Sequence, residues 1–347
     1  MQFSLLINII IAIPLFCCVF VANINPVNFW PSTFIGLGFL VWLGFNIFFL
    51  VYWALLKKRY FLISLITILI NHNNLKANFG SFSKSKENTL AKIKIVSLNT
   101  QLLGYFQEQN NADAIIKEIK NTQADIVCLQ EFLSLAPYDI NYFKTKLDMP
   151  YSYFKALADG RKKGKFGMVI FSKHPIKEKG FTDFGEYTGN MALWCTISIN
   201  DVLIKCYSLH LQSIRFSKKD YTVIKEGEQN INQNDAKNIL RRIKIAAKVR
   251  AIQVDNICKD LAKQKLPILL CGDFNEAPVS YSYGQFTKNL KDAFISGNVG
   301  LEATYIGPFP AYRIDYIMHG TEWQTLIYKS KKVSSDHKMI VATLQWK

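Results

Sequence analysis

Hydrophobic residues are unevenly distributed, and they divide the chain into two regions that require different surroundings. Residues 3–22 and 34–56 contain no charged side chain, and a third apolar run covers residues 61–70. An α-helix needs about 20 apolar residues to cross the ~30 Å hydrocarbon layer of a bilayer. The first two runs reach that length and the third is about half as long. The pattern predicts a transmembrane anchor over residues 1–71 with two helices, and a short third helix if the last run also crosses.

The first apolar run has a second interpretation, a cleaved signal peptide. It lacks a basic n-region, its small-residue cleavage signal is poor, and another hydrophobic span follows, so multi-pass anchoring in the membrane is the better interpretation. The uncharged loop 24–33 is typical of the outside, and the basic residues 57–59 are typical of the cytoplasmic side. Whether residues 60–71 cross again decides the side on which the rest of the chain lies, and the pattern leaves this open.

Beyond the anchor, the pattern changes to that of a globular α/β domain. Residues 72–90 are rich in Asn, Ser and Lys and are predicted to be a linker to a domain over residues 91–347. Amphipathic helices are expected over residues 111–121 and 235–264. Strands are expected over residues 93–99, 124–131, 167–172, 193–199, 202–211, 267–275, 313–319 and 339–346. Such alternation of strands and helices is typical of α/β folds.

Charge and cysteine content exclude few of the possible partners and types of site. The formal net charge of +16 and the pI near 9.4 favour phosphate-bearing partners, whether nucleic acid, anionic lipid head groups or soluble phosphoesters. General solubility and a membrane-facing bias explain the same charge. The seven cysteines include no Cys-x-x-Cys pair and no Cys/His cluster, so they indicate buried small residues rather than disulfides or a zinc site.

Several polar residues stand where apolar strands end. They are Asn99, Glu131, His210, Asp273 and Asn275. In layered α/β folds, ligands bind at strand ends, because the strands bring separate side chains together there. The sequence therefore predicts a functional site built from these residues.

The strand ends carry an ordered set of motifs that resembles the endonuclease/exonuclease/phosphatase family over residues 92–347. The motifs are SLNTQ (97–101), LQEF (129–132), SLHLQ (208–212), GDFN (272–275), RIDYI (313–317) and SSDH (334–337), with GMVIFSKHPI (167–176) as a further match. The resemblance implies a four-layer α/β sandwich, two mixed β-sheets flanked by helices, behind the transmembrane helices. It also implies a phosphoric ester hydrolase that depends on Mg²⁺, with Mn²⁺ as the other candidate.

Metal binding is expected at Glu131, because a carboxylate at a strand end suits a hard cation that prefers oxygen ligands. The resemblance gives Glu131 the same role. It also implies that Asn99 lies on the metal and phosphate side, and that Asp336 helps to position the metal.

The remaining site residues take catalytic roles under the resemblance. Asp273 orients or deprotonates the attacking water, and Asn275 binds phosphate or that water. His337 pairs with Asp315, and a histidine held by a carboxylate can act as a base or as a cation that stabilises the pentavalent phosphorus. His210 matches a histidine that some branches of the family use against the phosphate or the leaving group; as a lone strand histidine it is otherwise a satisfied core residue.

The substrate stays open at this level. Gln101 and the stretch SLHLQS (208–213) depart from the pattern of the family's repair nucleases. The His-Leu-Gln of that stretch resembles the sphingomyelinase and DNase-type branches. A membrane-tethered phosphodiesterase acting on lipid head groups explains the anchor, and a nuclease explains the basic charge. A non-catalytic binding protein would need a broken metal set, and no protein partner is implied. Lys162, Lys163 and Lys165 are expected in a solvated loop, and Arg241, Arg242 and Arg250 on the outer face of the long helix.

Overall fold

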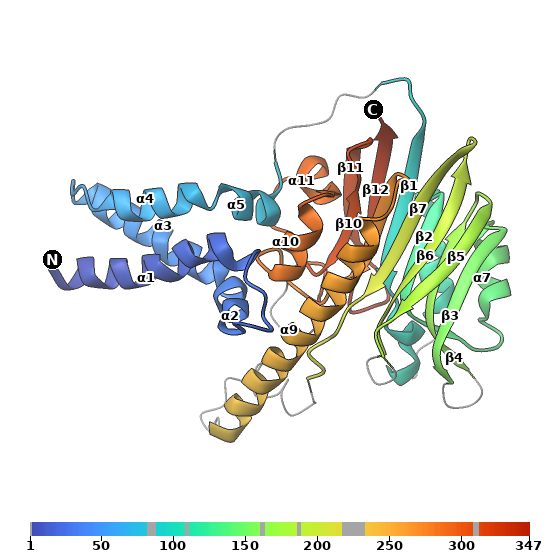
Figure 1. Ribbon diagram of the computed structural model, residues 1–347, viewed down its shortest axis with the longest axis horizontal. Helices are drawn as coiled ribbons and strands as arrows, with labels where there is room; N and C mark the ends of the chain where they lie inside the picture. Colours follow the sequence, from blue (N-terminus) through green and yellow to red (C-terminus); the bar gives the residue numbers. More distant parts are fainter. Residues whose placement is uncertain are drawn as a thin grey trace.

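The computed structural model describes residues 2–81, 88–107, 111–159, 164–185, 189–216, 233–307 and 312–347. They form two regions: an N-terminal module of helices over residues 2–79, and a two-sheet α/β domain that begins at residue 92 (Figure 1). The polypeptide passes between them once, through residues 80–91.

The α/β domain contains two mixed sheets. The strands are β1 (Lys92–Asn99), β2 (Ile126–Ser134), β3 (Tyr151–Asp159), β4 (Lys165–Ser172), β5 (Ile176–Asp183), β6 (Met191–Ile199), β7 (Val202–His210), β8 (Ile268–Asp273), β9 (Lys291–Asp292), β10 (Asp315–His319), β11 (Trp323–Lys332) and β12 (Lys338–Trp346). Their order is β11-β12-β1-β2-β4-β3 in the first sheet and β5-β6-β7-β8-β10-β9 in the second. The pairs β1–β2 and β7–β8 are parallel and the other neighbours are antiparallel.

Helices cover the outer face of each sheet, so the domain has four layers. The helices are η1 (Gln101–Gln107), α6 (Ala112–Thr122), α7 (Ile140–Leu147), α9 (Gln233–Leu261), α10 (Tyr281–Thr287) and α11 (Ala293–Gly297). Successive strand residues point to opposite faces; Ile95 of β1 enters the core between the sheets, and Val96 packs under α6 and α7. Helices α9 and α10 pack on the second sheet through Val254 and Phe286. The predicted fold class is confirmed.

The predicted elements of the domain are present, with shifts of a few residues at their ends. All eight predicted strands and both predicted helices correspond to observed elements. Four strands had no sequence prediction, namely β3, β5, β9 and β11, and each lies at an edge of its sheet.

The N-terminal module has five helices, α1 (Gln2–Val21), α2 (Pro31–Leu37), α3 (Phe39–Leu55), α4 (Phe61–Ile70) and α5 (His72–Phe79). Helices α1, α3 and α4 pack against one another and project away from the sheets; we call these three helices the bundle (Figure 1). Helices α2 and α5 lie at the end of the bundle that meets the α/β domain (Figure 1).

Two features of the module differ from the sequence expectation. The span expected over residues 34–56 is divided at Gly38 into α2 and α3, which meet at 57°. The bend follows from close packing, because a Cβ atom at Gly36 would lie 2.0 Å from the carbonyl oxygen of Val279, so α2 follows the surface of the domain. Helix α5 occupies the first part of the segment expected to be a linker.

Length and composition identify one described helix, α1, that is able to cross a membrane. Helices α2 and α3 would make a second span if the bent pair counts as one, and α4 is a shorter apolar helix.

The bundle buries several polar side chains among apolar ones, and it exposes large apolar side chains. Asn8 of α1 donates to Ser64 Oγ of α4 at 2.9 Å and accepts from Trp53 Nε1 of α3 at 3.1 Å. Asn71, which follows α4, donates to the carbonyl oxygen of Leu15 in α1 at 2.9 Å. Large apolar side chains on the outside include Phe3, Ile10, Ile13, Phe45, Phe48, Val51 and Ile66. This polarity is the one expected of helices that pack within lipid, where buried polar groups join the helices.

Candidate active site

Strands from both sheets bring polar residues to one edge of the sandwich. Asn99 ends β1, and Asp273 ends β8. In the register of the second sheet, Asp273 is paired with His210 at the end of β7 and with Asp315 at the start of β10. Parallel strands end at the same edge, and the antiparallel β10 begins there, so the sheet itself sets the spacing of three of these groups.

Asp273 is at the centre of this group and is 1% exposed. Its Oδ2 atom accepts hydrogen bonds from Asn99 Nδ2 at 3.0 Å and from Asn275 Nδ2 at 3.1 Å. Its Oδ1 atom accepts from the backbone N–H of Asn275 at 2.8 Å. Burial raises the pKa of Asp273 to about 6, although the neighbouring His337 pulls it down. A carboxylate with a pKa near neutrality is suited to accept a proton during catalysis.

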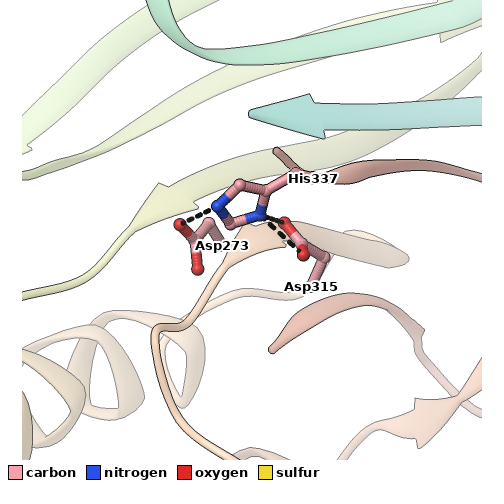
Figure 2. Close-up of side chains that lie close together, drawn as sticks. All are labelled: Asp273, Asp315 and His337. Atoms are coloured by element: carbon pink, nitrogen blue, oxygen red, sulfur yellow. Dashed lines mark hydrogen bonds and ion pairs between the residues drawn. The ribbon is translucent and has the colours of Figure 1, made fainter. Parts of the chain in front are cut away.

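His337 and Asp315 form a buried ion pair beside Asp273 (Figure 2). The Nδ1 atom of His337 lies 2.9 Å and 3.1 Å from the two carboxylate oxygens of Asp315, and its Nε2 atom lies 3.8 Å from Asp273 Oδ2. Burial opposes the charge on the ring, but Asp315 and Asp273 outweigh it and raise the pKa of His337 to about 10. The ring is therefore an imidazolium at neutral pH, positively charged where it meets Asp273.

Glu131, Asn99 and Asp336 form an oxygen-rich group in the same pocket. Glu131 lies in a β-bulge of β2 with a φ of 47°, the left-handed region in which strained residues often mark functional sites. Asn99 Nδ2 donates to Glu131 Oε1 at 3.2 Å. Burial raises the pKa of Asp336, and Glu131 adds to this rise while His337 opposes it. No lysine or arginine among the described residues pairs with either carboxylate.

A second set of possible metal ligands is Asp273, Asp315 and His337, whose ligand atoms lie within 4.8 Å of one another. By donor type this set could hold a metal ion. A protonated His337 has no free nitrogen lone pair, however, so the ring is not a ligand in the charged state that its two carboxylate neighbours favour. The oxygen group at Glu131 is the better match to a hard divalent cation.

His210 lies under the site and is 5% exposed. Its Nε2 atom is 3.4 Å from Glu131 Oε1 and 3.8 Å from Asp273 Oδ2, and neither ring nitrogen makes a hydrogen bond within the described part of the chain. Burial lowers the pKa of His210, so the ring is neutral and contributes no charge of its own.

The site opens into a pocket of about 250 Å³. Polar residues that line it include Asn99, Glu131, Asp273, Asn275, Asp336 and His337. Apolar and aromatic residues that line it include Leu37, Ile214, Phe216, Tyr305, Tyr312 and Ile314. Leu37 comes from α2 of the N-terminal module, and residues 214–216 begin the insertion that precedes α9, most of which lies outside the described residues.

Arg250 corrects the expectation that the arginines of the long helix are solvated. It is 2% exposed and lines the pocket. Its Nη1 atom donates to the carbonyl oxygen of Gln212 at 2.7 Å, and its Nη2 atom lies 3.4 Å from Glu276 Oε1. The Nε atom has no partner among the described residues. Arg215 also lines the pocket. Helical periodicity could have identified Arg250 as a buried residue, because it shares a helix face with the buried Ala246, Val254 and Ile257.

Three polar residues that the sequence analysis did not single out hold the site in place. Ser335 Oγ donates to the carbonyl oxygen of Asn99 at 2.7 Å and accepts from the backbone N–H of His337 at 3.1 Å. Thr304 Oγ1 accepts from the backbone N–H of Asp315 at 3.0 Å. Gln130 Nε2 crosses between the sheets to Ser208 Oγ at 2.9 Å. Ser335 lies within the SSDH motif, whereas Thr304 carries no sequence signal.

All eight predicted site residues therefore meet at one edge of the sandwich, and their roles remain predictions. Of the lysines expected in a solvated loop, Lys162 and Lys163 lie outside the described residues, and Lys165 is exposed at the start of β4.

The fold and the site define a class: a two-sheet α/β sandwich with carboxylates, amides and a charged histidine at its strand ends. Residues 96–337 match the profile of the Endonuclease/Exonuclease/phosphatase family, and the chain belongs to this family. Residues 1–78 match the profile of a domain of unknown function (DUF8431). No curated protein matches the chain.

Solved structures share the fold at low sequence identity. A family member from Bacteroides thetaiotaomicron is 17% identical with a TM-score of 0.52, and the match covers 75% of this chain and 100% of that one. A mannosyl-6-phosphatase from the same organism is 18% identical with a TM-score of 0.51, over 73% and 100% of the two chains. The catalytic domain of human Nocturnin with bound sulfate is 19% identical with a TM-score of 0.51, over 74% and 94%. Identities this low support the fold alone.

Proposed function

We propose that the protein is a membrane-anchored phosphoesterase that requires a divalent metal ion and uses an activated water. The observation that carries the proposal is the central position of Asp273. This carboxylate has a pKa near neutrality and is held by the amides of Asn99 and Asn275 beside the charged His337. Family membership supports hydrolysis of a phosphoester in general, and the site supports this division of roles.

Glu131, Asn99 and Asp336 would hold the metal. The carboxylate oxygens of Glu131 and Asp336 fit Mg²⁺ or Mn²⁺, and no thiolate is present among the donors. Asn99 donates to Glu131 through Nδ2 while its Oδ1 accepts from the backbone N–H of Gln101, so it would hold the metal by fixing Glu131. Glu131 helps to raise the pKa of Asp336, and neither carboxylate has a paired lysine or arginine in the described residues, so a cation would relieve their repulsion. A bound divalent cation would polarise the phosphoryl oxygen and neutralise charge there.

The chain's own groups would handle the proton and the charge. Asp273 would accept a proton from water, since its two amide partners fix the carboxylate and its pKa of about 6 lies near physiological pH. His337, kept protonated by Asp315, would place a positive charge beside the phosphorus as negative charge develops on its oxygens. Arg250 would supply a planar cation for a phosphate oxygen, held in place by Gln212 and Glu276.

The polarity of the bundle supports membrane anchoring by more than one helix. Its interior hydrogen bonds tie α1, α3 and α4 together, which a signal peptide destined for removal would not require. Helix α4 runs back towards the α/β domain, so the basic residues 57–59 lie at the far end of the bundle (Figure 1). If these residues lie in the cytoplasm, as positive charge favours, the catalytic domain is on the opposite side of the membrane. In this proposal residues 1–71 are the anchor and residues 91–347 the catalytic domain.

The test is hydrolysis by the purified full-length protein in Mg²⁺ and in EDTA, with Glu131→Gln beside the wild type. The panel contains bis-p-nitrophenyl phosphate, sphingomyelin vesicles, phosphoinositides and plasmid DNA. We expect turnover that EDTA abolishes and that Glu131→Gln lowers by about 100-fold or more. Asp148→Asn is the matched control, since this carboxylate is exposed at the end of α7 and pairs only with Lys120 among the described residues.

The other possible results of this panel would assign a different function. Fastest hydrolysis of plasmid DNA would favour a nuclease over a lipid-directed enzyme. A folded wild-type protein that turns over nothing on the panel would contradict the proposal and favour a binding protein on the same fold.

A further inference from the structure

The N-terminal module is docked on the α/β domain through close backbone contacts. A Cβ atom added at Gly36 of α2 would lie 2.0 Å from the carbonyl oxygen of Val279, and one added at Gly284 of α10 would lie 2.4 Å from the Cβ of Ala22. Gln285 Nε2 donates to the carbonyl oxygen of Ala22 at 2.8 Å. Glycine on each side of this contact lets the two regions approach until no side chain fits between them.

We call the close contacts of Gly36 with Val279 and of Gly284 with Ala22 the seam, and polar contacts lie on two sides of it. Asn25 Nδ2 donates to Asp255 Oδ2 of α9 at 3.1 Å and lies 3.3 Å from the hydroxyl of Tyr281. On the other side, Arg313 Nη2 donates to the carbonyl oxygen of Ala77 in α5 at 2.7 Å, and the same guanidinium forms a buried ion pair with Asp292 at 2.7 Å. Contacts at α2 and at α5 together fix the orientation of the module on the domain.

One consequence is that the module forms part of the pocket wall. Leu37, the last residue of α2, lines the pocket, and its carbonyl oxygen accepts a hydrogen bond from the Tyr312 hydroxyl at 3.0 Å. Tyr312 and Ile314 line the pocket as well. The pocket that contains Glu131 and Asp273 therefore has an apolar wall contributed by the module.

This wall lies next to the apolar helices. Gly38 follows Leu37 and forms the bend, and α3 begins at Phe39 and leads away from the domain (Figure 1). Val41 and Phe45 of α3 are 55% and 49% exposed. If the bundle lies in hydrocarbon, the pocket wall is one residue from the start of a membrane helix, at the surface of the bilayer.

The exposed face of α9 also carries residues suited to the surface of the bilayer. Leu240, Ile245 and Ile252 are 47%, 51% and 53% exposed on a helix that also carries Arg241 and Lys248. Helix α9 packs against α2, and Lys244 lies 4.9 Å from the ring of Trp30 just before α2. Basic and large apolar side chains on one exposed helix face are typical of contact with a bilayer surface.

We propose that the substrate is a phosphoester that carries a long apolar chain, with its phosphate at Asp273 and the start of its chain along Leu37 and Tyr312. This deepens the function proposed above and rests on it. The apolar chain remains in the bilayer beside α3 while the phosphate enters the pocket, so the module selects for substrates that are dissolved in a membrane.

The experiment compares two chromogenic diesters that differ only in their second group. They are hexadecyl p-nitrophenyl phosphate in phosphatidylcholine vesicles and the water-soluble methyl p-nitrophenyl phosphate. The full-length protein is reconstituted in the same vesicles, and kcat/KM is measured for both diesters in Mg²⁺. We expect a preference of about 100-fold or more for the hexadecyl ester, since its chain holds the ester in the bilayer beside the pocket and its first methylene groups pack against Leu37.

Variants test whether the module produces the preference. Leu37→Gln should lower the ratio of the two kcat/KM values by about tenfold or more, because it places an amide where the chain would pack. Tyr312→Phe, which removes only the hydroxyl that bonds to α2, should lower the ratio by about threefold. Leu203→Gln is the control, since Leu203 is 39% exposed at the opposite end of β7 from His210 and should leave the ratio unchanged.

Different results would contradict the proposed function and the proposed role of the module. If the wild-type protein cleaves neither diester, the proposed function is wrong. If it cleaves the methyl ester as well as the hexadecyl ester, or if neither Leu37→Gln nor Tyr312→Phe in folded protein changes the ratio, phosphoester hydrolysis stands and the role of the module is wrong.

Discussion

The bundle and the α/β domain both bury apolar side chains but differ in what they expose. In the domain, strands place Ile95, Cys128 and Leu269 between the sheets, and a group of polar residues is buried at the active-site edge. In the bundle, Asn8 and Ser64 meet in the interior while the outer surface is apolar. In both regions hydrogen bonds join buried polar groups from different elements, as between Asn8 and Ser64 in the bundle and between Gln130 and Ser208 in the domain.

The exposed apolar surface of the bundle is the basis for proposing that the two regions lie in different solvents, and Leu37 of the module and residues of the domain meet at the pocket. Hydrophobic burial stabilises a domain in water, whereas helices in lipid associate through packing and hydrogen bonds between them. If the bundle lies in lipid as proposed, the contact between Gly36 and Val279 would be the boundary between the two environments, and the pocket that contains Glu131 and Asp273 would lie close to it.

The largest expected effect is on catalysis, and it comes from replacing the buried carboxylate of Asp273. Asp273→Asn should lower kcat by about 10²–10⁴-fold, because the variant has no proton acceptor. It should lower the melting temperature only modestly, because the asparagine NH₂ would face one N–H donor while burial already disfavours the carboxylate and raises its pKa to about 6. Turnover and thermal unfolding of the same preparation check both parts. A variant that unfolds at lower temperature and keeps its activity would reverse the assignment.

A buried ion pair next to the seam contributes to stability rather than to catalysis. Arg313 and Asp292 are 2% exposed and form an ion pair at 2.7 Å. Arg313→Met should lower the free energy of unfolding by about 3–5 kcal/mol, because it leaves the Asp292 carboxylate buried without its partner. Lys331→Met is the control, since Lys331 is an exposed partner of Glu118 and should cost under about 1 kcal/mol. Equal costs for the two variants in denaturant titration would contradict the buried role.

A buried histidine outside the site makes the domain sensitive to acid. His319 contacts the Gly320 carbonyl oxygen at 2.8 Å and Thr325 Oγ1 at 2.9 Å, and burial lowers its pKa to about 4. The unfolded chain takes up a proton below pH ~6.5 and the folded one does not, so this stability is lost as pH falls from ~6.5 towards 4.

The histidine can be tested by comparison with an uncharged variant. Between pH 7 and pH 5 the wild type should lose about 2 kcal/mol that His319→Asn retains. Unfolding at both pH values measures this difference. Parallel losses in the two proteins would mean that His319 titrates as it does in water.

The sequence predicted the interior of the domain better than its edges. The eight predicted strands are those with neighbours on both sides, whose runs are mostly apolar. The four edge strands have a different pattern; β5 contains the charged run Lys-Glu-Lys, and β11 ends in Lys-Ser-Lys-Lys. An edge strand exposes one side to water, so polar residues there obscure the strand pattern.

The site was predictable where it depends on strand ends and motifs, and not where it depends on packing between regions. Asn99, Asp273 and His337 were expected together because each follows a strand or a motif. The bend at Gly38 and the place of Leu37 in the pocket arise from contact between residues some 240 positions apart, as Gly36 and Val279 are, and no local pattern records such contact.

The smallest effect belongs to the interior of the bundle. Asn8→Leu removes hydrogen bonds to Ser64 and Trp53 and should destabilise the bundle in lipid bicelles by about 0.6–2 kcal/mol. Ile13→Leu, on the exposed face, is the control and should have no measurable effect. Unfolding in bicelles by added SDS gives the comparison. If Asn8→Leu stabilises the protein, the bundle behaves as a water-soluble core would.

The most direct test of the central claim is the solvent that surrounds each region of the reconstituted protein. Spin labels would be placed at Phe48 on the bundle and at Val202 on the domain, with Cys17 and Cys258 replaced because the other five cysteines are buried. The account predicts that oxygen relaxes the label at position 48 far more than a water-soluble nickel chelate does, and that the order reverses at position 202. A label at position 48 that the nickel chelate reaches as readily as the label at position 202 would place the bundle in water and contradict the account.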